Sequence, residues 1–217
     1  MTASRVVIGV DESGKGDFFG PLVIAAFSAP DSACDGLVSL GVRDSKLIAE
    51  KKLLGIAASL RDNYPHELVV IGPEKYNELY SQIRNLNKLL AWGHARAIEN
   101  LLLRQEADLA ISDKFGKPEL IEKALLKKGR TIEVQQLVRG EAITQVAAAS
   151  ILARAGFVGQ MRRLSEQVGV TLPRGAGAEV DLAARRLVES QGAETLEKVA
   201  KTHFRNYQRA TDLSLGV

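Results

Sequence analysis

Residues 9–23, GVDESGKGDFFGPLV, place two adjacent carboxylates, Asp11 and Glu12, at the end of an apolar segment and directly before a glycine-flanked lysine. The preceding residues, RVVIGV, have the apolar and β-branched character of a strand. Side chains of a strand alternate between its two faces, so two neighbouring carboxylates cannot enter one site while the strand stays regular. We therefore expect the strand to break at Glu12. The glycines that follow predict a tight loop, and LVIAAFSA predicts a second strand.

Two adjacent acids before such a loop favour metal-assisted phosphodiester chemistry, because carboxylate oxygens are ligands for hard cations. Acidic residues are also common where strands end, so an ordinary turn is the alternative. Residues 9–15 also have the G-x-x-x-x-G-K spacing of a nucleoside-triphosphate-binding loop. The next residue argues against that motif, because Gly16 stands where a Ser or Thr hydroxyl is required.

The rest of the chain alternates between strand patterns and helical periodicity. Three early strands followed by β-α-β alternation predict an α/β fold, with a mixed sheet of about five strands flanked by helices and a helical C-terminal region. In the helix expected over 73–105, the apolar spacing assigns Trp92 and His94 to packing or to the surface rather than to ligand binding, so we assign His94 a structural role. Strands are expected over 5–11, 21–28, 66–72, 107–113 and 131–137, and helices over 47–61, 73–105, 118–128, 142–168, 178–191 and 194–206.

The composition is that of a compact globular protein. With 46% hydrophobic and 25% charged residues, the 217-residue chain can bury a sizeable core, and we expect a single domain over residues 1–217. No apolar run is long enough to span a membrane, the N-terminus has no secretory apolar region, and the single Cys34 cannot form an internal disulfide. These features favour the cytoplasm. The net charge of +3 mildly favours a nucleic-acid partner.

Several segments resemble the type 2 ribonucleases H, and ribonuclease HIII more than ribonuclease HII. The resemblance covers nearly the whole chain and implies a ribonuclease H-like catalytic domain. Ribonucleases HIII usually carry an additional N-terminal substrate-binding domain, whereas the first strand here starts within a few residues of Met1. We therefore expect either that the catalytic domain binds its duplex unaided, or that the chain belongs to a short branch with preferences between the two types. The matching segments are DESGKGDFFGPLV at 11–23, RDSKL at 43–47, YNELY at 76–80, NLNKLLAWGHARAIENL at 85–101, VAAASILAR at 146–154, LPRGAG at 172–177 and AKTHFRN at 200–206.

The acidic residues of a catalytic site follow from both lines of reasoning. Asp113 ends an apolar strand, and sites form at the carboxyl ends of parallel strands, so Asp113 can meet Asp11 if their strands are neighbours. The resemblance matches Asp11, Glu12, Asp113 and Glu141 to the family's four catalytic and metal-binding acids. Glu141 alone would be an ordinary acid at a helix N-terminus. Four clustered carboxylates repel each other without cations, which implies Mg²⁺ or Mn²⁺, while the scattered histidines disfavour zinc.

The resemblance implies an endonuclease that hydrolyses the RNA strand of RNA–DNA hybrids by a two-metal-ion mechanism and leaves 5′-phosphate and 3′-hydroxyl ends. The partner is then the hybrid duplex, with no membrane and no obligatory protein partner. Recognition of RNA requires contacts to the 2′-hydroxyl, which the glycine-rich loop can supply through its backbone amides. The expected substrate-binding residues are Ser13, Gly14, Lys15, Gly16, Ser45, Lys46, Arg174 and Lys201, with His203 as a further candidate.

Three other functions remain open at this point. Ribonucleases HII cut at single ribonucleotides embedded in DNA and use a C-terminal tyrosine, for which the segments 172–177 and 200–206 offer no obvious counterpart. A catalytically silent hybrid-binding module is a second alternative, although all four acids are present. A 3′-exonuclease of related fold is the third. That class favours Asp-x-Glu, which keeps both acids on one strand face, whereas Asp11 and Glu12 are adjacent.

Overall fold

The computed structural model describes residues 4–212, which divide into two compact units. The first unit contains the residues up to Glu12, Val23–Val69 and Asn85–Ala155. The second contains Ser13–Leu22, Val70–Arg84 and the residues from Gly156 onward. The expectation of one domain over 1–217 stays a prediction.

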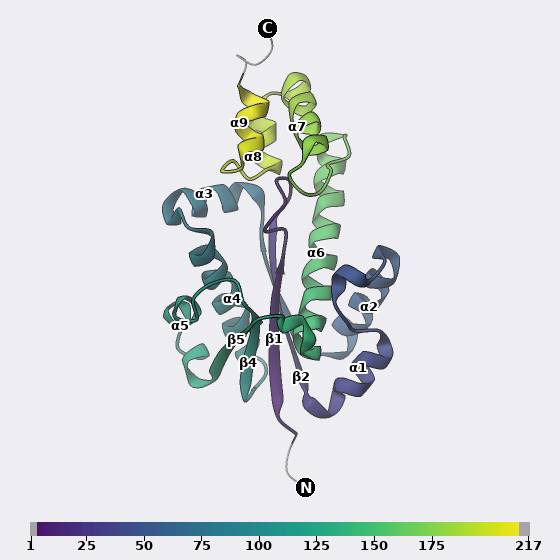
Figure 1. The fold of residues 1–217 in the computed structure, drawn as a ribbon, viewed down its shortest axis with the longest axis vertical. Coiled ribbons are helices and arrows are strands. Elements are labelled where there is room, and N and C mark those ends of the chain that lie inside the picture. Colours follow the sequence, from purple (N-terminus) through teal and green to yellow (C-terminus); the bar gives the residue numbers. More distant parts are fainter. Residues whose placement is uncertain (1–3, 213–217) are drawn as a thin grey trace. The chain divides into compact units, whose positions relative to one another are not determined.

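A five-stranded sheet forms the centre of the first unit (Figure 1). Its spatial order is β3-β2-β1-β4-β5, so the first strand lies in the middle. β4 pairs in parallel with both β1 and β5, and Val10 of β1 is in register with Ser112 of β4. The strands are β1 (Val6–Ser13), β2 (Leu22–Pro30), β3 (His66–Ile71), β4 (Leu109–Asp113) and β5 (Glu133–Leu137).

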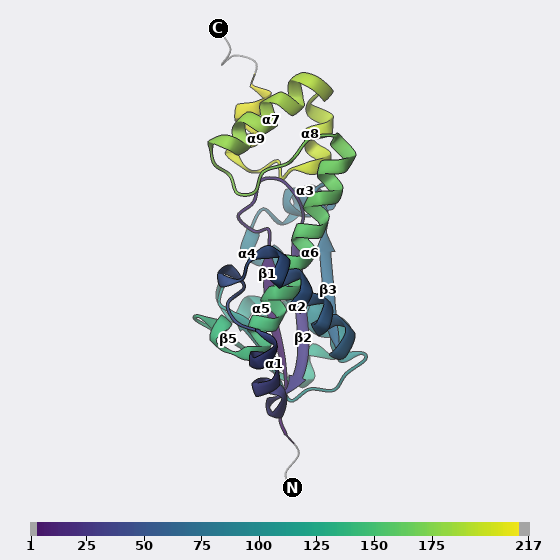
Figure 2. The same cartoon turned by 90° about the vertical axis from the view of Figure 1, so that its right-hand side faces the viewer.

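Helices cover both faces of this sheet (Figures 1 and 2). On one face lie α1 (Cys34–Leu40), α2 (Glu50–Asn63) and the first part of α6 (Thr144–Val168). On the other lie α4 (Leu86–Leu102) and α5 (Glu119–Ala124). Short 3₁₀ turns complete the unit at Asp31–Ala33, Ser45–Leu47, Gly129–Thr131 and Gly140–Ala142.

Two glycines let helices lie directly against the sheet. A Cβ at Gly9 of β1 would come within 2.1 Å of the Gln145 carbonyl carbon in α6. A Cβ at Gly93 of α4 would come within 2.7 Å of the Ile24 side chain in β2. At Gly9 backbone packs on backbone, and at Gly93 the helix packs on a strand side chain, so the absence of a Cβ lets α6 and α4 approach the sheet closely.

The second unit is helical. It contains α3 (Pro73–Ile83), the last part of α6, α7 (Ala178–Gln191), α8 (Ala193–Val199) and α9 (Arg205–Thr211). The segment 13–22 runs through this unit and is tied to its C-terminal part, because Phe19 forms an isolated antiparallel bridge with Ala200 and the Gly20 amide donates to the Val199 carbonyl. None of the helices between residues 4 and 212 combines the length and the apolar character needed to cross a bilayer.

The mixed five-stranded sheet with flanking helices and a helical C-terminal region confirms the predicted fold class. The expected break of β1 at Glu12 is wrong, because the strand continues to Ser13. The single helix expected over 73–105 is also wrong. Arg84 adopts a left-handed conformation with φ +48°, and the Asn85 side chain then accepts a hydrogen bond from the Lys88 amide, which starts α4 as a new helix.

Two further elements differ from expectation. The helix expected over 194–206 is interrupted after Val199, because Ala200 leaves the helix to pair with Phe19. Helix α1, Cys34–Leu40, was not predicted, since its polar beginning resembles a loop. Its end is marked by Gly41, which has φ +104°.

Candidate active site

Asp11 and Asp113 lie side by side at one edge of the sheet. Val10 is in register with Ser112, so the next residues of the two parallel strands are Asp11 and Asp113. Gly9 faces α6, and Asp11, two residues further along the same strand, faces the same way. Because β1 and β4 are neighbours in the sheet, these two acids can meet.

Glu141 reaches this edge through a tight turn between β5 and α6. The Gly140 amide donates a 2.9 Å hydrogen bond to Oδ1 of Asp113, and a Cβ at Gly140 would lie 2.9 Å from the Asp113 Cα. The preceding residue, Arg139, has a left-handed backbone with φ +58°, which is uncommon for a residue other than glycine. The turn therefore holds the residue before Glu141 directly against the end of β4.

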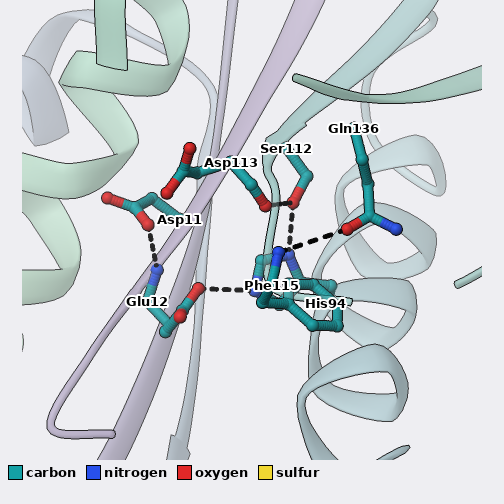
Figure 3. A network of polar contacts seen from close by, with 7 residues as sticks. All are labelled: Asp11, Glu12, His94, Ser112, Asp113, Phe115 and Gln136. Carbon is teal, nitrogen blue, oxygen red and sulfur yellow. Dashed lines mark hydrogen bonds and ion pairs between the residues drawn. The ribbon is translucent and has the colours of Figure 1, made fainter. Parts of the chain in front are cut away.

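Glu12 points to the opposite face of the sheet, toward α4 (Figure 3). Its Oε2 lies 3.0 Å from Nε2 of His94, and Nδ1 of His94 lies 3.0 Å from the Ser112 hydroxyl. Phe115 packs on the histidine ring, with the ring centroids 4.7 Å apart. Because β1 stays regular through Ser13, its two adjacent acids leave the strand toward different helices.

Asp11 is held on the α6 side. Burial, and then repulsion from the Glu12 carboxylate, raise the pKa of Asp11 to about 6. A hydrogen bond from the Ser150 hydroxyl of α6 and a 2.8 Å bond from the Glu12 amide act in the other direction and lower the pKa. The balance shows that the charged form of Asp11 is costly in the protein alone, so a bound cation would stabilise it.

The four acids fit a divalent cation with oxygen ligands. All are carboxylates at least partly shielded from solvent, and Asp11 and Glu12 repel each other. Within residues 4–212, however, no three His, Cys, Asp or Glu side chains already stand together at metal-binding distances.

Ser45, expected to contact substrate, is buried instead, and this expectation is corrected. Only 3% of the residue is exposed, and its hydroxyl lies 2.9 Å from that of Ser150. The Ser45 carbonyl also accepts a hydrogen bond from Arg154. Ser45 therefore supports Ser150, which bonds Asp11, whereas its neighbour Lys46 is exposed.

In the second unit, the loop after Glu12 has the conformation that its glycines suggest. Gly14 has φ +90°, and a Cβ there would lie 2.2 Å from the Pro21 carbonyl oxygen, so only glycine fits. Lys15 and Gly16 are exposed, and Ser13 is half-buried. In the same unit Arg174 is also exposed.

Lys201 is the second correction among the expected substrate contacts. Its side chain is completely buried, and Nζ donates to the carbonyl oxygens of Asp17 and Gly20, each at 2.7 Å. Burial lowers the pKa of Lys201 to about 7. This ammonium group holds the 13–22 segment and cannot reach a phosphate. His203 is exposed and stacks on Tyr80 and Tyr76, with ring centroids 4.1 and 5.6 Å away.

Three residues with evident contacts to the acids were not predicted as functional: His94, Ser112 and Ser150. His94 was correctly expected to be structural in the sense of being buried, but its contact with Glu12 was missed. Ser150 is the only hydroxyl in the alanine-rich run VAAASILAR, and a single polar side chain in a buried helix face was the available signal.

Comparison with known proteins agrees with this geometry. The family model for ribonuclease HII matches residues 8–207. Ribonuclease HIII of Chlamydia felis is 43% identical over 211 residues, covering 96% of this chain and 70% of that protein. Ribonuclease HIII of Chlamydia pneumoniae is 46% identical over 206 residues, covering 94% and 69%.

A solved structure, Bst-RNase HIII in complex with Mn²⁺, superimposes with a TM-score of 0.89 at 34% identity, covering 98% of this chain and 71% of that one. These matches confirm the resemblance inferred from the motifs. The chain therefore belongs to the ribonuclease HII family and is a type 2 ribonuclease H, an endoribonuclease, similar over nearly its whole length to ribonucleases HIII.

Proposed function

We propose that this enzyme cleaves the RNA strand of RNA–DNA hybrids with the help of Mg²⁺ or Mn²⁺, leaving 5′-phosphate and 3′-hydroxyl ends. The observation that carries the proposal is the register of β1 and β4, which sets Asp11 beside Asp113, together with the Gly140 bond that brings Glu141 to the same edge. The similar ribonuclease HIII structure is a complex with Mn²⁺, which supports the choice of metal.

Asp11, Glu12, Asp113 and Glu141 would hold the metal ions. When bound, two such ions supply activation of the attacking water and stabilisation of the leaving 3′-oxygen. The protein's own contribution is to fix the carboxylates. The Ser150 hydroxyl and the Glu12 amide hold Asp11, and the Gly140 amide holds Asp113. Carboxylates fixed in this way need little reorganisation when the ions and the duplex arrive.

The loop of Ser13, Gly14, Lys15 and Gly16, in which Lys15 and Gly16 are exposed, is the proposed substrate-binding element. Lys15 would hold a phosphate as a point charge, and the backbone amides beside the glycines would meet the minor-groove edge of the RNA strand. Lys46 and Arg174 are exposed and remain proposed backbone contacts. Ser45 and Lys201 are not included, because both are buried.

Continuous RNA tracts are the proposed substrate in preference to single ribonucleotides. The relatives at 43% and 46% identity are ribonucleases HIII, which supports this preference. The reducing cytoplasm is the proposed location, since Cys34 is a free thiol and no protein partner or membrane contact is needed for the reaction.

Cleavage of two labelled duplexes tests the proposal. One duplex carries a continuous RNA strand on DNA and the other a single ribonucleotide within DNA, and each is assayed with Mg²⁺ and with Mn²⁺. We expect cleavage of the continuous hybrid only, and none with the Asp113→Asn variant as a control for contaminating nuclease. Cutting at the single ribonucleotide would replace the proposed specificity with that of ribonuclease HII, and no cleavage of either duplex would contradict the enzyme function.

A further inference from the structure

We propose that His94 is a positioning residue that, held by Ser112, sets the orientation of the Glu12 carboxylate for metal binding. The inference rests on the proposed metal-dependent function, because it assigns His94 a task only if Glu12 is a metal ligand. It adds to the four acids a fifth residue on a separate helix, α4.

The burial of the pair carries the first step. The His94 side chain is 0% exposed and that of Glu12 is 8% exposed, so neither can exchange its partner for bulk water. A buried polar ring is costly unless its nitrogens are hydrogen-bonded, and both nitrogens of His94 have partners at 3.0 Å. Phe115 packs against the ring at an interplanar angle of 53° and limits its rotation.

The direction of the bonds follows from the chemistry of the groups. An ionised carboxylate has no hydrogen to donate, so Nε2–H of His94 donates to Oε2 of Glu12. Nδ1 faces the Ser112 hydroxyl, which also lies 2.8 Å from the Asp113 carbonyl oxygen. The contact at Nδ1 fixes the ring plane from the side opposite to Glu12, as partners behind a metal site commonly do.

The same contacts connect the two strands that supply acids. Glu12 belongs to β1, and Ser112 directly precedes Asp113 in β4, with His94 of α4 between them (Figure 3). Restriction of the Glu12 side chain by this connection lowers the side-chain entropy that is lost when a cation binds. Residues that support metal ligands in this way typically change metal affinity or activity roughly 10- to 100-fold when removed.

Calorimetric titration of Mn²⁺ into the metal-free protein, combined with cleavage kinetics, tests the role of His94. We expect His94→Ala to weaken Mn²⁺ binding roughly 10- to 100-fold and to lower kcat, with the KM for the hybrid unchanged. His94→Gln should recover most of the affinity, because its side-chain amide can donate to Glu12. His66→Gln is the matched control, since the His66 ring lies in β3 and bonds the Tyr64 carbonyl, so this variant should behave as wild type.

A second background separates positioning from packing. When Glu12→Gln is already present, removal of His94 should cause no further loss of Mn²⁺ affinity, whereas a purely structural role would continue to cost affinity and thermal stability. Ser112→Ala retains the imidazole but removes the contact that fixes its plane, so it should weaken Mn²⁺ binding several-fold even if His94→Ala does not fold. If the wild-type protein binds Mn²⁺ and cleaves, and both His94→Ala and Ser112→Ala behave in the same way, the role of His94 is overturned and the proposed function stands. A wild-type protein that neither binds Mn²⁺ nor cleaves would overturn the proposed function as well.

Discussion

The amide of Gly140 donates a 2.9 Å hydrogen bond to Oδ1 of Asp113 and thereby ties the turn that carries Glu141 to the end of β4. Asp113 and Glu141 are 28 positions apart in the sequence. This hydrogen bond between Asp113 and the residue before Glu141 holds their two segments together. The geometry depends on the missing side chain of residue 140, because a Cβ there would lie 2.9 Å from the Asp113 Cα and 3.1 Å from its amide nitrogen.

Gly140→Ala should therefore impair catalysis more than folding. The new methyl group would meet backbone rather than a flexible side chain, so the turn must shift and take Glu141 with it. We expect kcat to fall by at least 10-fold, with a loss of about 1–3 kcal/mol in the free energy of unfolding. Hybrid cleavage and urea unfolding measure the two effects. Gly55→Ala in α2, where a Cβ meets nothing within 4 Å, is the control and should be neutral; full activity of Gly140→Ala would show that the turn does not position Glu141.

Asp11→Asn should abolish cleavage and yet stabilise the metal-free protein. The pKa of Asp11 is raised from 3.8 to about 6, so its ionised form is disfavoured in the folded state. Removing that charge at pH 8 should raise the free energy of unfolding by at most about 3 kcal/mol, the equivalent of this shift. Thermal unfolding in the presence of a chelator measures the gain. Cleavage at the wild-type rate by Asp11→Asn would contradict the assignment of this acid.

The pH dependence of the wild-type protein follows from the same shift. Between pH 3.8 and about 6 the folded state holds a proton on Asp11 that the unfolded state has lost. The free energy of unfolding of the metal-free protein should therefore fall as the pH rises from 3.8 to about 6. Metal binding requires the ionised carboxylate, so Mn²⁺ affinity should fall as the pH drops below about 6. Calorimetric titrations of Mn²⁺ into the protein at about pH 5, 6, 7 and 8 test this expectation. An affinity that is constant over this range would argue against Asp11 as a ligand.

Much of the fold could be predicted from the sequence because hydrophobic periodicity reports burial directly. The predicted helix over 178–191 coincides with α7, and the strands before Asp11 and Asp113 lie where the apolar runs indicated. The break between α3 and α4 could not be predicted in this way. Arg84 adopts a positive φ that its side chain does not favour, and the periodicity of the flanking residues continues across it.

The acids of the site were predictable, but the groups behind them were not. Asp11, Glu12 and Asp113 lie at the ends of apolar strands and so carry a local signal, whereas Glu141 is indicated only by the resemblance. His94 and Ser112 are brought to Glu12 by the packing of α4 on the sheet, which no local pattern encodes. Lys201 shows the opposite error. A lysine near the C-terminus suggests a phosphate contact, but only the tertiary structure shows that its ammonium group lies in the interior.

Lys15→Ala should weaken hybrid binding and cleavage without changing thermal stability. Lys15 is exposed beside the glycines of the loop, so loss of its charge removes a phosphate contact but no core packing. We expect hybrid affinity to fall several-fold and the salt dependence of binding to become shallower, by about one counterion. Fluorescence anisotropy with labelled hybrid at several salt concentrations measures both. Lys51→Ala, an exposed lysine of α2, controls for net charge; equal effects of the two substitutions would argue against a specific contact of Lys15.

Lys201→Met should destabilise the protein by an amount that grows with pH. The substitution keeps the volume of the side chain but leaves the carbonyl oxygens of Asp17 and Gly20 without their donor, which costs about 1–3 kcal/mol for a buried group. In wild type the pKa of Lys201 falls from 10.5 to about 7 on folding, so the unfolded chain holds the extra proton between these values. The free energy of unfolding of wild type should therefore rise with pH across this window, and that rise should be lost in Lys201→Met. Urea unfolding at pH 7 and at about pH 9 compares the two proteins. An identical pH slope in both would show that Lys201 stays charged in the folded state, held by the two carbonyl groups.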